Sequence, residues 1–129
     1  MSIAGYAAGT KPSERVSRRR ATVSFVVDDA LIAEAGRRLL DAAPPQTRVI
    51  LFGSHARGEA RRHSDLDFLV VEPSVDDPVQ ESVRLRRELR SLLVPMDIVV
   101  VSEHDLEEWR DVRGSLIHAA LADGRMLAV

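Results

Sequence analysis

The sequence contains no cysteine, which excludes disulfide bonds and any metal site built from thiolates. It also has no apolar run of the roughly 18 residues that a membrane-spanning helix requires. Its first residues lack the apolar core of a secretory signal peptide. From these absences we expect a cytoplasmic protein that makes no membrane contact.

Net charge is small as well. The 129 residues carry a formal charge of -2, which argues against direct nucleic-acid binding by the domain as a whole. Hydrophobic residues make up 45% and charged residues 29%, as in ordinary globular domains, and the length fits one domain. Basic residues are concentrated near the N-terminus, where no helical or strand period is visible. We therefore predict a flexible basic tail at residues 1–24, followed by one domain at residues 25–129.

Helices and strands are predicted to alternate after the tail. Asp28 is a suitable N-cap for a first helix, which the prolines at 44–45 would end. In a later helix, begun by a capping box at Ser102, Leu106 and Trp109 are expected to pack inward. This alternation predicts an α+β (α/β) fold, a small sheet covered by helices mainly on one face. The predicted strands are residues 47–52, 66–71, 96–101 and 126–129, and the predicted helices are residues 29–43, 55–62, 79–93 and 114–122, with one more beginning near residue 106.

One turn carries a signal for phosphate binding. Residues 49–52 form a short apolar run ended by Gly53, which is typical of a buried strand. Gly53 and Ser54 then lead into a short helix, so backbone N–H groups and a hydroxyl are presented together. Such a turn favours phosphate oxygens, and a glycine lets a phosphate approach the backbone closely.

Acidic residues follow the turn. Asp65 and Asp67 are two residues apart at the start of a strand, so their carboxylates share a face. Asp97 opens the next predicted strand, and the three carboxylates would converge if the two strands are neighbours. Hard oxygen ligands of this kind suit Mg²⁺. The combination fits metal-assisted phosphoryl or nucleotidyl transfer. For Asp97, a strand-entry aspartate without a role is the alternative interpretation.

The spacing of these residues resembles the nucleotidyltransferase superfamily of the DNA polymerase β type. More narrowly, it is similar to the minimal nucleotidyltransferase (MNT) domains, over roughly residues 30–129. The resemblance implies a mixed β-sheet with its active site on the open face. The residues that carry it are Gly53-Ser54-His55-Ala56-Arg57-Gly58, then Ser64-Asp65-Leu66-Asp67, then Asp97 on a later strand.

The resemblance also assigns roles. Asp65 and Asp67 would hold Mg²⁺ against a nucleoside triphosphate, and Asp97 would either bind a second metal ion or accept the proton of the attacking hydroxyl. The catalytic and metal-binding predictions are thus the same three aspartates.

Four residues are predicted to contact the nucleotide, ATP or another NTP. Gly53 and Ser54 would hold the β and γ phosphates, and Ser64 would support the loop. Arg57 would reach back to the phosphates, because a guanidinium binds phosphate in a bidentate manner. A surface salt bridge is the open alternative for Arg57.

The acceptor of the nucleotide is the least determined part. The resemblance implies an antitoxin that transfers AMP from ATP to a hydroxyl of a HEPN-type ribonuclease toxin and so inhibits it. One alternative is a small-molecule nucleotidyltransferase, as in antibiotic-modifying relatives, which would need an added domain or a homo-oligomer to complete its site. The other is a non-catalytic module that covers a toxin or another partner.

Overall fold

The computed structural model describes residues 27–60 and 65–127. The predicted tail, Arg61, Arg62 and Ser64 therefore lie outside the described residues. In chain order the elements are α1 (Asp29–Ala42), β1 (Arg48–Phe52), α2 (Ser54–Arg57), β2 (Leu66–Glu72), α3 (Pro78–Glu88), the 3₁₀ turn η2 (Arg90–Leu92), β3 (Met96–Ser102), α4 (Glu103–Trp109), α5 (Leu116–Asp123) and β4 (Arg125–Leu127). No helix in this part of the chain is long and apolar enough to cross a membrane.

The strands form one mixed sheet in the order β3-β2-β1-β4. The β2 and β3 strands are parallel, which requires the crossover through α3, whereas β1 is antiparallel to both β2 and β4. The parallel register aligns Asp67 directly with Asp97. A mixed α+β sheet of the predicted kind is thereby confirmed, with β3 and β4 at its edges.

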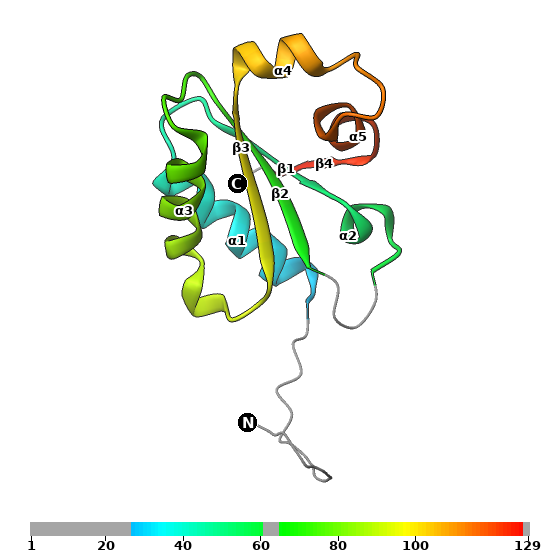
Figure 1. The fold of residues 1–129 in the computed structure, drawn as a ribbon. Helices are drawn as coiled ribbons and strands as arrows, with labels where there is room; N and C mark the ends of the chain where they lie inside the picture. The colour runs from blue at the N-terminus through cyan, green and yellow to red at the C-terminus, as the bar shows by residue number, and fades with distance from the viewer. Residues whose placement is uncertain (1–26, 61–64, 128–129) are drawn as a thin grey trace, which may run out of the picture.

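The two faces of the sheet are covered unequally (Figure 1). Helices α1 and α3 cover one face over the larger core, which includes Leu39, Phe68 and Leu85. Helices α4 and α5 lie over the other face, where a smaller core gathers around Leu69 and Ile117. The second face is therefore only partly covered, and it remains accessible toward the start of β2 and β3.

Helix starts follow the predicted capping chemistry. The carboxylate of Asp28 accepts a hydrogen bond from the Leu31 N–H at 2.9 Å, and Ser102 caps α4 in the same way through Asp105. Asp77 and Ser115 cap α3 and α5. Each cap satisfies a backbone donor that the first helical turn leaves without a partner.

Four details differ from the sequence-based predictions. Helix α4 begins at Glu103, directly after its Ser102 cap, and not near residue 106. Helix α2 ends at Arg57 because Gly58 adopts a left-handed conformation (φ 72°), so the predicted helix 55–62 is too long. The predicted helix 79–93 is interrupted after Glu88 and continues only as a 3₁₀ turn. Trp109 does not pack inward: 48% of it is exposed, whereas Leu106 is buried as expected.

Candidate active site

The turn after β1 is packed against Asp67. Gly53 has φ 79°, a conformation that only glycine adopts without strain, and a Cβ at this position would collide with the Asp67 carboxylate. The Gly53 carbonyl accepts hydrogen bonds from the Ala56 and Arg57 N–H groups at 3.1 and 3.2 Å, which fixes the first turn of α2. The predicted phosphate-binding turn and the predicted acidic strand are therefore in direct contact.

Two of the three aspartates are neighbours across the sheet. Asp67 and Asp97 are paired in register on β2 and β3, so their Cα atoms lie about 5 Å apart, the spacing of adjacent strands. Asp65 precedes β2 by one residue and Asp67 follows two residues after it, which orients both toward the α4/α5 face. Asp67 is half-buried, whereas Asp65 and Asp97 are exposed.

The negative charge of Asp67 is the least favourable one in this cluster. Its pKa is raised, first by burial and then by repulsion from Asp97 and Asp65. His55 and Arg57 act in the opposite direction but do not compensate for these effects. A partly buried carboxylate between two like charges is a site where a cation gains the most from binding.

The structure pairs Arg57 with a neighbouring acid. Its Nε donates to Glu59 at 2.8 Å, and this hydrogen bond is the main reason that the pKa of Arg57 is raised. This is the surface salt bridge that sequence reasoning left open. Arg57 also lowers the pKa of Asp67, so its positive charge lies near the aspartate cluster.

The carboxylates of Asp65, Asp67 and Asp97 suit a hard cation, although in the described residues they do not already surround a metal position. Among the residues 27–60 and 65–127, no group of three or more His, Asp or Glu side chains stands arranged around a metal position. The fit rests instead on the chemistry of carboxylate oxygens and on the repulsion recorded in the raised pKa of Asp67. Binding a cation there would require the side chains to close on it.

A second acidic pair, which the sequence did not predict, lies at the other end of β2. Glu72 is only 2% exposed, on the α1/α3 face, and its pKa is raised to about 7, chiefly by burial and then by its hydrogen bond to Glu81. Glu81 is lowered to a pKa of about 2 because Arg84 donates two hydrogen bonds of 2.8 Å to it. Glu72 is thus held toward its protonated form beside an ionised Glu81, a contact that no local sequence pattern reveals.

The sequence model of the nucleotidyltransferase domain family matches residues 32–122. The chain belongs to this family. The match contains the Gly53 turn, Asp65, Asp67 and Asp97, so the contact between turn and acids lies within the family's domain. No curated protein matches the sequence at a significant level.

Several solved structures with a similar fold come from toxin–antitoxin complexes, and another is a putative nucleotidyltransferase from Sulfolobus solfataricus (22% identical, TM-score 0.53 over 75% of this chain and 76% of that one). A chain of a toxin–antitoxin crystallised with AMP-PNP is 22% identical, with a TM-score of 0.54 over 74% of this chain and 72% of that one. A chain of an MntA–HpeT toxin–antitoxin mutant is 20% identical, with a TM-score of 0.55 over 74% and 72%. A chain of tri-AMPylated Shewanella oneidensis HEPN toxin in complex with MNT antitoxin is 20% identical, with a TM-score of 0.51 over 77% and 71%. At this identity the likeness establishes the fold alone.

Proposed function

We propose that this protein is a Mg²⁺-dependent antitoxin that transfers AMP from ATP to a hydroxyl of a HEPN-type ribonuclease toxin. The observation that carries the proposal is the contact of the Gly53 turn with Asp67, which faces Asp97 across β2 and β3. The family supplies the reaction type, and the relatives named above supply the toxin, the adenine nucleotide and the AMPylation. Such a reaction would take place in the cytoplasm, where ATP and the toxin are present.

In the proposed reaction the acceptor oxygen forms a bond to the α-phosphorus of ATP. The bond from that phosphorus to the oxygen bridging to the β-phosphate breaks, and pyrophosphate leaves with the electron pair. The proton of the acceptor hydroxyl passes to the carboxylate of Asp97, the exposed member of the aspartate pair. Asp97 lies at the sheet edge, where an outside acceptor can approach it.

Asp65, Asp67 and Asp97 would hold Mg²⁺, which would neutralise phosphate charge and orient the triphosphate. The Gly53-Ser54 turn would bind the β and γ phosphates through its backbone and the Ser54 hydroxyl. Arg57 would exchange its contact with Glu59 for a contact with phosphate oxygens, since both partners are anionic and the guanidinium is exposed. Ser64 would support the loop before Asp65.

A labelling experiment tests the proposal. Purified protein is incubated with Mg²⁺ and each α-³²P-labelled NTP, with and without the protein encoded by the neighbouring gene. We expect label on that protein from ATP, and none with Asp65→Asn. Label on a small molecule instead would identify an antibiotic-type nucleotidyltransferase. Inhibition of the toxin that persists in Asp65→Asn and Asp67→Asn, without any label, would identify a non-catalytic antitoxin.

A further inference from the structure

An apolar groove of about 490 Å³ opens on the α4/α5 face of the sheet. Val99 and Val101 of β3 line it, together with Trp109 of α4 and Leu116 of α5. Trp109 is 48% exposed and Leu116 is 43% exposed. Tryptophan is among the residues most enriched at the energetic centres of protein interfaces, so an exposed tryptophan in an apolar groove marks a candidate docking site.

The groove lies next to the candidate active site along β3. Asp97, Val99 and Val101 alternate with buried residues along β3, so they share one face of the strand. Val99 therefore lies about 7 Å from Asp97 along the strand. Because β3 is an edge strand, a molecule lying in the groove reaches Asp97 without crossing the sheet.

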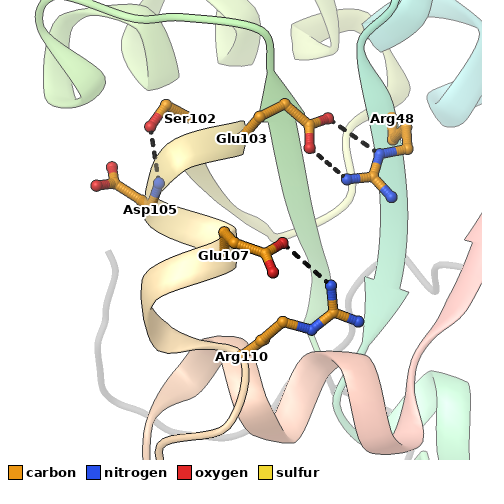
Figure 2. Close-up of polar contacts among 6 residues, drawn as sticks. All are labelled: Arg48, Ser102, Glu103, Asp105, Glu107 and Arg110. Atoms are coloured by element: carbon orange, nitrogen blue, oxygen red, sulfur yellow. Dashed lines mark hydrogen bonds and ion pairs between the residues drawn. The ribbon is translucent and has the colours of Figure 1, made fainter.

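The acidic side chains of α4 differ in whether an arginine neutralises them (Figure 2). Glu103 and Glu107 point to one side of α4, where Arg48 and Arg110 neutralise them. Asp105 points to the other side and lines the groove, and its carboxylate forms no ion pair with any residue that the structure describes. Only its backbone N–H is used, by Ser102. A half-buried carboxylate without a cation favours a partner that brings one.

We infer that this groove docks the acceptor protein, which places an apolar side chain between Trp109 and Leu116 and a basic side chain against Asp105. The inference rests on the proposed function, because it assigns the surface that brings the acceptor hydroxyl to Asp97. An acceptor seated there is held one strand pleat from the reacting groups. A small-molecule acceptor would need no apolar surface that extends two pleats away from the site.

The experiment compares variants in acceptor labelling and in nucleotide binding. Trp109→Ala and Leu116→Ala should each raise the KM for the acceptor protein about tenfold or more, since interface anchors of this type have large effects. The dissociation constant of AMP-PNP should stay within twofold. Val79→Ala is the matched control, because Val79 is 74% exposed on α3, on the opposite face. It should change neither quantity.

Charge reversal gives a second measurement that does not depend on apolar packing. Asp105→Lys should raise the KM for the acceptor severalfold, whereas Asp111→Lys, outside the groove, should not. Normal acceptor KM in Trp109→Ala, Leu116→Ala and Asp105→Lys would overturn the docking site. A groove that instead joins two copies of this chain would appear as a dimer that Trp109→Ala dissociates, and would also overturn it. Failure of the proposed function looks different, because the unsubstituted chain would then label no protein at all.

Discussion

Strand β2 carries two acids, one partly and one fully buried, that differ in whether the chain itself compensates their charge. Asp67 lies at its start on the α4/α5 face, and Glu72 ends it on the α1/α3 face. Burial is the first cause of a raised pKa in both. For Glu72 the compensation lies within the chain, because its protonated form is favoured beside Glu81, which Arg84 neutralises. Asp67 faces two further aspartates instead, so a bound cation would have to compensate its negative charge.

The difference separates an acid that completes the fold from an acid that is prepared for a ligand. The hydrogen bond between Glu72 and Glu81 and the ion pair of Glu81 with Arg84 stay inside the chain, although Oε2 of Glu72 has no hydrogen-bond partner among the described residues. The repulsion around Asp67 lowers the stability of the unliganded protein, and such conflict between local charges is usual at functional sites. Each of the following predictions tests this comparison.

The largest effect is expected for Asp67→Asn. Nucleotide transfer should fall by about 10³-fold, because the variant loses a carboxylate that would bind Mg²⁺, the ion that neutralises the phosphate charge. The melting temperature of the unliganded variant should equal or exceed that of the wild type, since a raised pKa means that the charged form is disfavoured in the folded state. Glu72→Gln is the matched control and should retain transfer. A large fall in the melting temperature of Asp67→Asn would contradict the comparison.

Gly53→Ala should both destabilise the protein and impair transfer. The new Cβ meets the Asp67 carboxylate and the backbone is held at φ 79°, so we expect a loss of about 1–3 kcal/mol in the free energy of unfolding. Gly58→Ala is a partial control. Gly58 has φ 72° and ψ 19°, an ordinary left-handed conformation, and among the described residues no atom beyond its chain neighbours lies within 4 Å of its Cβ position, so this variant carries a backbone cost without a clash. Chemical denaturation measures both, and equal losses would argue against packing of the turn on Asp67.

Glu72 should make stability depend on pH. Between its ordinary pKa of 4.5 and its raised pKa of about 7, the unfolded chain releases the proton while the folded chain keeps it. Stability should therefore fall as pH rises through this window, by on the order of 2 kcal/mol. Glu81 contributes the opposite trend below pH 4.5, because its lowered pKa means that stability is lost as the pH falls toward 2.

Denaturation curves at pH 5 and pH 8 test this expectation. Glu72→Gln should remove most of the fall, while Asp41→Asn, an exposed acid on α1, should leave it unchanged. The same fall in Glu72→Gln and in the wild type would mean that the proton is held elsewhere.

The smallest effect concerns Arg57. Glu59→Gln should release the guanidinium and lower the dissociation constant of AMP-PNP by about two- to threefold, since an exposed ion pair is worth little. Arg57→Gln should raise it about tenfold if the side chain binds phosphate. Titration calorimetry distinguishes these outcomes from a merely structural salt bridge, for which both variants would bind like the wild type.

Local patterns predicted most of the elements. The strands 47–52, 66–71 and 96–101 match β1, β2 and β3 to within one residue at each end, because short apolar runs bounded by turn residues are strong local signals. The cap at Asp28 was predicted because aspartate is a favoured N-cap residue, and the structure confirms it. The sequence predicted a phosphate-binding turn and an acidic strand start, and the close packing of Gly53 on the Asp67 carboxylate is a finding of the structure.

Long-range contacts were not predictable in this way. Glu72 meets Glu81, and Arg48 meets Glu103, only because β2, α3 and α4 fold back on the sheet. Gly124, which follows α5, has φ -78°, and glycine is needed there because a Cβ would collide with the Ala120 carbonyl and Ile50. Trp109 was expected in the core but lines a groove instead. The placement of α4 on the sheet decides this, and the sequence alone does not reveal it.

The most direct test of the central claim is the melting temperature during titration with Mg²⁺ and AMP-PNP. It needs no acceptor, so it examines the two acids of β2 alone. We predict that the ligands raise the melting temperature of the wild type and of Glu72→Gln, because anything that binds only the folded state stabilises it. Asp67→Asn should show no rise. A rise that persists in Asp67→Asn, or that disappears in Glu72→Gln, would contradict the assignment of Asp67 to the metal–nucleotide site.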